Sequence, residues 1–553
     1  MSTATTTAPT TAAPRHREPP GAVEPFAGTG WLVRLMLRLD RVRIPAWALS
    51  FLALVAGSVA SLEATYPTAE SLQARAALMD NPAAVLMTGP AFALDDYTFG
   101  AMVANELSLW IFAPAAVMSV LLAVRHTRAE EESGRLEVVR ALPVGRLAPP
   151  TAALVTVAVA NLAVALSVAA ALVGTGMEPV DSVAFAVAAG LTGMVFGGVA
   201  AVAAQVTEHA RAASGAGLGA VALAFLVRGV GDVIDSQGSW LSWFSPFAWA
   251  QQTRLYVDLR WWPLVLPVVA TVVLLVLAAS LARRRDLGAG LRPPSPGPAG
   301  ARASLLSPAG LAWRLTAGTF VAWAIGLVLF AVAFGTLATA LDGMVEEMPA
   351  ITDWVEIDLA DLTRSFAAVM LSILGIGPPA LLVWGVLQLR GEEQAGRLEG
   401  LLVSGSSRTA VLAGWCATVT LWALAALVLL GLGVGVGVML ATGDAGWVVE
   451  LTAASLAYVP ATLLHGAVAV ALVGLLPRWS ALAWAPVLWS GLVVWLGGLL
   501  DLPDWAAGLA PLARTPLVPG VDLAWTPLLV MAALAVLLSA AGVVGLRRRD
   551  LPR

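Results

Sequence analysis

Long apolar runs are the feature that most limits what this chain can fold into. About twelve stretches of roughly 18 to 30 residues carry almost no charge, and about 20 residues of helix cross the ~30 Å hydrocarbon core of a bilayer. The runs cover 44–62, 103–124, 150–174, 182–205, 213–230, 263–282, 315–340, 366–389, 409–440, 450–476, 480–500 and 527–546. Strand-period alternation is absent, and helices satisfy their own backbone hydrogen bonds in lipid. The sequence therefore predicts an all-α, polytopic membrane protein of about 12 transmembrane helices.

The few charges, 12% of the residues, are sorted between the two sides of such a membrane. With the N-terminus in the cytoplasm, the inner side receives 26 of the 32 arginines but only 13 of the 36 acids. Cytoplasmic loops carry an excess of positive charge, so this orientation is favoured. The abundance of Ala, Gly, Val, Leu and Arg is typical of a GC-rich bacterial gene. We therefore expect a multi-pass protein of the bacterial cell (cytoplasmic) membrane with N- and C-termini both cytoplasmic.

Three absences limit the chemistry. The chain has no lysine, which excludes a GxxxxGK[ST] phosphate-binding loop and a Schiff-base amine. A single cysteine, Cys416, excludes an intramolecular disulfide. The four histidines are scattered without metal-ligand spacing, so no metal site and no bound cofactor is expected in this chain.

The chain divides into two similar halves. Residues 1–28 are predicted to be a disordered cytoplasmic tail, 29–285 a first six-span half, 286–306 a Pro- and Gly-rich cytoplasmic linker and 307–553 a second six-span half. The motif RRRDL occurs at 283–287 and again at 547–551. Because each half has an even number of spans, the two repeats must be parallel in the membrane. Residues 31–47 are expected to form a basic amphipathic helix on the inner surface before the first span.

The best-matched long stretch of the repeat is charged. RAEEESGRLEVVRALPVGR (128–146, the first charged segment) corresponds to RGEEQAGRLEGLLVSGSSR (390–408, the second charged segment), each between the second and third spans of its half. The candidate functional residues are Glu130, Glu131, Gly134, Arg135 and Glu137 in the first segment and Glu392, Glu393, Gly396, Arg397 and Glu399 in the second.

On a continuous helix these segments would contain one ion pair each, Glu131 with Arg135 and Glu393 with Arg397, four residues apart. Gly134 and Gly396 would allow another backbone to approach closely. An ordinary cytoplasmic loop would explain the arginines. It would not explain six glutamates at matched positions on the side that is otherwise poor in acids, so we interpret each segment as a docking helix for a two-fold symmetric partner.

The charged segments resemble the first cytoplasmic loop of ABC-2-type exporter membrane subunits, in which an acidic cluster precedes a Gly, a Glu and a terminal Arg. Six spans per half and N-terminal interfacial helices are also similar to that family. YPTAESLQARAALMDNPAAVLMTGPAF (66–92) with EEESGRLE and ALPVGR resembles actinobacterial proteins described as polyketide-antibiotic exporters of the tetronasin-resistance kind. In the second segment, however, Gln394 replaces Glu132 and VSGSS replaces ALPVG, so the two docking sites need not be equivalent.

This resemblance implies a permease, not an enzyme. Two copies of a separate ATPase subunit would bind ATP and Mg²⁺, engage the two charged segments and drive export of hydrophobic or amphiphilic compounds such as antibiotics. The implied partners are thus the ATPase, the lipid bilayer and a hydrophobic small molecule, with no nucleic acid.

The residues of a substrate path are harder to identify from the sequence. Asn105 and Glu106 fall near the outer start of the second span, where an ionisable group at membrane depth suggests function, although Glu106 is close enough to the interface to be hydrated. His465 suits an interhelical hydrogen bond better than a proton relay. The glycines of GLGVGVGV (431–438) and SGAGLGA (214–220) indicate close helix packing.

Two rival classes remain. A proton-driven secondary transporter of twelve spans would need intramembrane acids, and the apolar runs hold almost none. A polytopic enzyme acting on a lipid-linked substrate would need paired acids or a nucleophile in an outer loop, which duplicated cytoplasmic glutamates do not provide.

Overall fold

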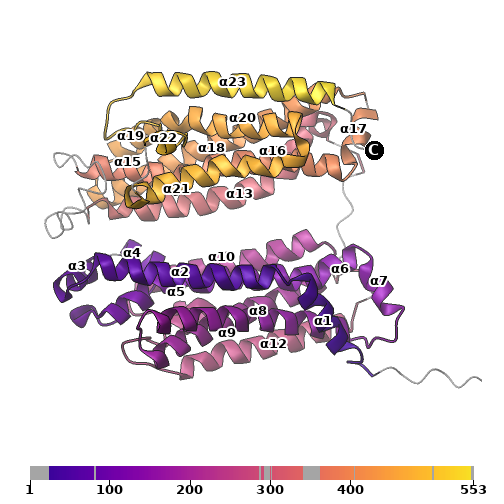
Figure 1. The fold of residues 1–553 in the computed structure, drawn as a ribbon, viewed down its shortest axis with the longest axis vertical. Helices are drawn as coiled ribbons and strands as arrows, with labels where there is room; N and C mark the ends of the chain where they lie inside the picture. Colours follow the sequence, from indigo (N-terminus) through magenta and orange to yellow (C-terminus); the bar gives the residue numbers. More distant parts are fainter. Residues whose placement is uncertain are drawn as a thin grey trace, which may run out of the picture. The chain divides into compact units, whose positions relative to one another are not determined.

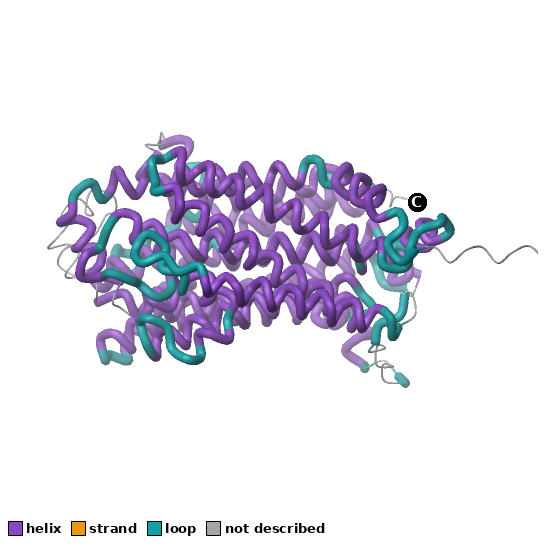
Figure 2. The backbone as a smooth tube through the Cα atoms, turned by 90° about the horizontal axis from the view of Figure 1, so that it is seen from below, coloured by secondary structure: helices purple, strands orange, loops and turns teal. Residues whose placement is uncertain are grey.

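The computed structural model describes residues 24–79, 82–285, 288–291, 299–300, 302–339, 362–403, 405–500 and 504–549. Within these ranges every regular element is a helix, as the tube in Figure 2 shows by its colouring. The predicted all-α class is confirmed. The acidic segment 342–361 and residues 286–287, 292–298 and 301 of the predicted linker lie outside the described residues.

Contacts divide the chain into two compact units. Unit 1 comprises residues 1–67, 88–93 and 97–295, and unit 2 comprises 68–87, 94–96 and 296–553.

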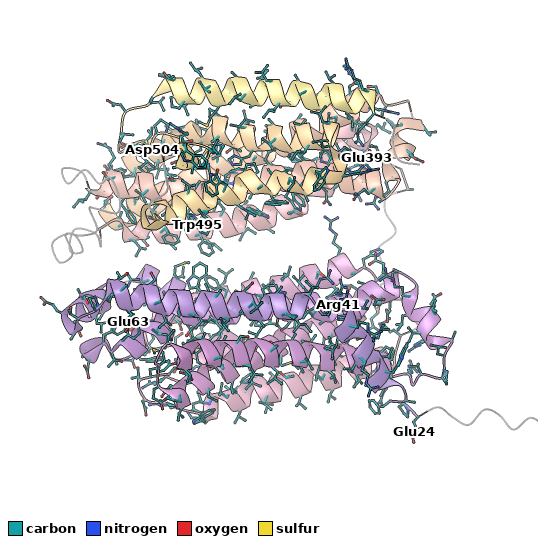
Figure 3. The ribbon with its side chains drawn as sticks, in the orientation of Figure 1. Glu24, Arg41, Glu63, Glu393, Trp495 and Asp504 are labelled. Carbon is teal, nitrogen blue, oxygen red and sulfur yellow. The ribbon has the colours of Figure 1, made fainter. Side chains whose placement is uncertain are left out.

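Unit 1 is a bundle of long helices with short helices at their ends (Figure 1). Its elements are α1 (Thr29–Leu39), α2 (Arg43–Thr65), α5 (Phe99–His126), α6 (Arg128–Glu132), α7 (Arg135–Arg140), α8 (Ala148–Gly174), α9 (Pro179–Val206), α10 (Ala210–Ile234), η2 (Ser242–Phe244), α11 (Pro246–Gln251), η3 (Trp262–Leu264) and α12 (Val265–Ala282). Figure 3 labels Arg41 and Glu63 at opposite ends of α2.

The centre of unit 1 is formed by α5 and α9, which bury most of their length. Phe112 on α5 and Phe185 on α9 meet edge to face, with ring centroids 5.4 Å apart. Asn161 on α8 donates to Ser119 Oγ at 2.8 Å, so a polar contact also links neighbouring spans. Helices α2 and α12 lie outside this centre and expose large apolar side chains, which suits contact with lipid.

Unit 2 has a similar order of elements. Its helices are η4 (Ala303–Leu306), α13 (Pro308–Gly335), η5 (Thr336–Thr339), α15 (Leu362–Leu374), α16 (Gly377–Gln394), α17 (Arg397–Val403), α18 (Arg408–Thr442), α19 (Gly446–Ser455), η7 (Leu456–Tyr458), α20 (Val459–Leu475), η8 (Pro477–Ala483), α21 (Trp484–Leu500), α22 (Asp504–Ala507) and α23 (Trp525–Arg548). The short elements α3 (Ala69–Met79), α4 (Pro82–Thr88) and η1 (Leu94–Asp96) precede α5 in the chain.

Glycines set the helix spacing in unit 2. A Cβ on Gly437 of α18 would lie 2.3 Å from the Val332 carbonyl oxygen of α13, and a Cβ on Gly474 of α20 would lie 2.0 Å from the Gly542 carbonyl oxygen of α23. The packing predicted for 431–438 is thus confirmed. For 214–220 it holds only at Gly217, which meets Val120, because Gly215 and Gly219 have nothing within 4 Å.

Eleven helical segments of the described chain are long and apolar enough to cross a membrane. They match eleven of the predicted runs, and the run predicted at 480–500 is α21, which has 17 residues. A span needs about 17 to 25 residues, so α21 is at the lower end of that range.

The basic helix expected over 31–47 is interrupted. Helix α1 ends at Leu39, and α2 begins at Arg43 after a bend at Asp40. Leu32 and Met36 of α1 are buried, whereas Leu39 at its end is 51% exposed. Residues 25 and 27, assigned to the tail by sequence, accept backbone hydrogen bonds from Leu147 and Gly145 at 2.9 Å.

Candidate functional site

The two charged segments fold as helix, left-handed glycine, helix. In unit 1, α6 is followed by Gly134 with φ +73° and then by α7. In unit 2, α16 is followed by Gly396 with φ +72° and then by α17. A positive φ costs other residues about 1–2 kcal/mol, which explains a glycine at both matched positions.

Close backbone approach does not explain these glycines, contrary to expectation. A Cβ at Gly134 or Gly396 would have nothing within 4 Å. The glycine permits the reversal of the chain between two short helices.

The predicted ion pairs four residues apart are also wrong. Arg135 pairs with Glu130 at 3.3 Å, and Arg397 pairs with Glu392 at 2.6 Å, in both cases five residues apart. The glycine ends the first helix before the arginine, so the regular i,i+4 geometry does not extend across it. The hydrogen bond from Arg397 to Glu392, together with the charge of that carboxylate, raises the pKa of Arg397.

Glu131 faces into unit 1. Its carboxylate pairs with Arg128 on α6 and binds Arg285, just beyond α12, through both oxygens at 2.7 and 3.0 Å. The side chains of Arg128 and Arg285 are 1% and 8% exposed. This two-oxygen arrangement is the strong form of an arginine–carboxylate pair.

Glu393 makes the corresponding connection in unit 2. Its Oε2 lies 2.8 Å from Arg390 and 2.7 Å from Arg549, just beyond α23. Figure 3 labels Glu393 near the α17 end of the unit and Asp504 toward the opposite end. In both units, therefore, an acid of the charged segment is tied to the arginine that follows the last span.

A second contact joins each charged segment to the residues at the end of the last span of its unit. Arg146 donates to the carbonyl oxygens of Ala282 and Arg283, at 3.3 and 3.4 Å, and Arg408 donates to that of Arg549 at 2.7 Å. Sequence reasoning noted the repeated RRRDL motif but not its contact with the repeated glutamates. The glutamates and the RRRDL motif repeat at nearly the same offset, about 262–264 residues, and this shared offset could have indicated that they are in contact.

Other residues of the segments face outward. The side chains of Arg135 and Arg397 are 72% and 64% exposed, and Glu137 and Glu399 are also exposed. Leu398, which lies between Arg397 and Glu399 in the sequence, is by contrast buried in the core of unit 2.

A buried acid next to the first segment escaped the sequence analysis. Asp40, at the bend between α1 and α2, is fully buried. It pairs with His126 Nε2 at the end of α5 and lies 3.2 Å from both Arg125 and Arg43. The sequence feature that could have indicated this site is a single acid within an arginine-rich stretch.

The proposed substrate-path residues lie in separate units. Asn105 donates to the Tyr97 hydroxyl at 3.2 Å and borders, with Gln251, a cavity of about 20 Å³. That volume suits one water and not a drug-sized ligand. Glu106 is half-buried one residue further along α5.

His465 links two helices of unit 2. Its Nδ1 is 2.7 Å from the Ala461 carbonyl oxygen, and its Nε2 is 3.1 Å from Ser490 Oγ on α21. This geometry agrees with the interhelical hydrogen bond that the sequence favoured over a proton relay.

One ion pair lies within a span. Arg228 and Asp232 of α10 are buried and 3.3 Å apart, and Ser242 Oγ donates to Asp232 at 2.5 Å. Sequence reasoning ended this span at 230 and so missed the pair, although its i,i+4 spacing was visible. Among the described residues, no three His, Cys, Asp or Glu side chains gather as a metal site would require.

The comparisons with known proteins both lead to one multidrug efflux permease. A family model described as the C-terminal domain of the multidrug efflux system permease Rv1217c matches residues 305–547. Over 530 residues the chain is 36% identical to the multidrug efflux system permease protein Rv1217c of Mycobacterium tuberculosis (strain ATCC 25618 / H37Rv), and the alignment covers 95% of each chain. Together with its membrane-spanning helices, this similarity shows that the chain belongs to the multidrug efflux permease family of Rv1217c.

Proposed function

We propose that this chain is the transmembrane subunit of an ATP-driven, ABC-2-type exporter of hydrophobic or amphiphilic compounds such as antibiotics. Separate ATPase subunits bind ATP and Mg²⁺ and dock on the two charged segments at the cytoplasmic side. The name of the relative supports the transport of drugs. The lack of lysine supports a separate ATPase, because this chain has no residue for a phosphate-binding loop of the GxxxxGK[ST] type.

The coupling part of the proposal rests on one ion pair in each unit. Glu131 and Glu393 each connect a charged segment to the arginine after the last span of the same unit. A subunit that pulls on the exposed side of the segment therefore also moves the end of that span. Chains of such contacts are the physical means by which a nucleotide-driven motion reaches transmembrane helices.

We assign docking and coupling to different glutamates. The exposed Glu137 and Glu399 are available to a partner, whereas the inward-facing Glu131 and Glu393 transmit its motion within the chain. We expect the double variant Glu137→Arg with Glu399→Arg to lose co-purification with the ATPase. The double variant Glu131→Gln with Glu393→Gln should keep co-purification but lose most drug-stimulated ATP hydrolysis.

The test is efflux from intact cells together with ATP hydrolysis by the purified complex. Asp258→Asn serves as a control, because Asp258 is 62% exposed in the loop before α12, at the other end of that helix from Arg285. Membrane insertion should be the same in all variants. Efflux that resists vanadate but stops with a protonophore would contradict the proposal and favour the proton-driven alternative.

A further inference from the structure

Unit 1 contains a cavity of about 510 Å³ beside the first charged segment. Four arginines, Arg140, Arg146, Arg283 and Arg285, line it together with one acid, Glu131. The volume falls in the range of small-molecule sites, which is roughly 300–1,000 Å³. A cavity with this excess of positive charge favours an anion.

The four arginines differ in whether their side chains already have hydrogen-bond or ion-pair partners. Arg285 is committed to Glu131 and to Gln205 Oε1 at 2.7 Å, and Arg146 donates to carbonyl oxygens at the end of α12. Arg140 and Arg283, by contrast, make no hydrogen bond or ion pair through their side chains in the described part of the chain. Burial lowers the pKa of Arg140, and the positive charge of Arg146 lowers it further. An anion in the cavity would relieve this crowding of like charges.

A buried histidine nitrogen adds a second observation. His126 lines the cavity with a side chain that is only 1% exposed. Its Nε2 pairs with Asp40, while its Nδ1 is buried without a hydrogen-bond partner. Buried polar atoms normally have a hydrogen-bond partner, so this nitrogen is available to a group bound in the cavity.

The cavity lies at the ends of several candidate spans, a position that a lipid headgroup could reach. Its walls include the last residue of α5, the start of α8 at Pro149, Gln205 near the end of α9 and Ala282 at the end of α12. Four candidate spans thus end around it, which places it at the level of the lipid headgroups. Basic pockets between span ends on the cytoplasmic side are known to hold anionic headgroups.

We propose that this cavity is a binding site for a phosphate-bearing anion, supplied by the headgroup of an anionic phospholipid or by free phosphate. Arg140 and Arg283 bind the phosphate oxygens, and the site lies against Glu131. The second unit differs at the decisive position, since Leu402 corresponds to Arg140. The site therefore belongs to unit 1.

The test uses the full chain purified in detergent and native mass spectrometry with short-chain phosphatidylglycerol and phosphatidylcholine. Wild type should retain phosphatidylglycerol in preference to phosphatidylcholine. Arg140→Leu, which copies the residue of unit 2, and Arg283→Gln should each weaken that binding about fivefold, as expected for one arginine near an anionic surface. Arg211→Leu removes an exposed arginine outside the cavity and should change nothing.

Competition with inorganic phosphate distinguishes the two sources. Displacement by phosphate assigns the site to the free anion, and persistence of the lipid assigns it to the headgroup. Equal weakening by Arg140→Leu and Arg211→Leu would overturn the proposal, because it would indicate only general surface charge. Absence of both phosphate binding and lipid preference in wild type would also overturn it. Unchanged melting temperatures in detergent show that each variant is folded.

Discussion

The first and second charged segments share one backbone path but differ in what surrounds them. In unit 1 the helix breaks at Thr127, before the segment begins, so α6 is separate from α5. In unit 2 the break comes earlier, between α15 and α16, and α16 continues unbroken to Gln394. Glu132 accepts a hydrogen bond from the Ala210 backbone at the start of α10. The residue at the matched position of the second segment is the neutral Gln394.

The two charged segments also differ in the contacts that their inward-facing glutamates make. Glu131 uses both carboxylate oxygens, whereas Glu393 uses Oε2 for both arginines and leaves Oε1 buried without a hydrogen-bond partner. Unit 1 also has Asp40 and the basic cavity next to its segment. The common part, an acid tied to the arginine after the last span, is what the coupling proposal needs. The remaining contacts make the two segments unequal.

The largest expected effect separates the two inward-facing acids. Glu131→Ala should destabilise unit 1 by about 3–5 kcal/mol, because it leaves Arg128 and Arg285 buried without their carboxylate. Glu393→Ala should cost less, since Arg390 and Arg549 are 12% and 15% exposed and reach water more easily. Thermal unfolding in detergent measures both. Glu137→Ala, at an exposed acid of the same segment, should stay within about 0.5 kcal/mol. A larger loss at Glu393 would reverse the comparison.

A smaller effect tests the contacts of Asp40 in unit 1. Asp40→Asn should cost about 1.5–3 kcal/mol, the range for hydrogen bonds to a charged group. The loss is limited because Arg43 and Arg125 are 51% and 35% exposed and can turn to solvent. Hydrogen exchange should accelerate in α6 and α7 but not in α17.

The matched control for Asp40 is Glu63→Gln, an exposed acid at the other end of α2. Equal acceleration in both units after Asp40→Asn would show that the acid is not specific to the first segment.

The smallest effect tests what the two segments have in common. Gly134→Ala and Gly396→Ala should each destabilise by about 1–2 kcal/mol, because both backbones have positive φ and neither site is sterically crowded. Gly391→Ala, within α16 and also uncrowded, should instead stabilise by about 0.5–1 kcal/mol. Thermal unfolding checks all three, and unequal losses at Gly134 and Gly396 would refute a shared turn.

Much of the site was visible in the sequence as positions but not as partners. The repeat identified Glu131 and Glu393 correctly as matched residues, yet the helical spacing rule assigned them to Arg135 and Arg397. That rule fails here because it assumes an unbroken helix, whereas Gly134 and Gly396 end the first helix of each segment. The Asp40 cluster was missed because His126 is 86 residues from Asp40 in the chain, and no regular spacing connects the two.

The amino-acid order was enough to assign the class of this protein. Apolar runs of span length permit only membrane helices, and a constant repeat offset identifies matched segments, because both are properties of order along the chain. Helix packing, in contrast, was needed to show which arginine each glutamate binds and that a basic cavity lies beside one segment. Those contacts join span ends distant in sequence, and they depend on how the helices pack rather than on how the residues are spaced.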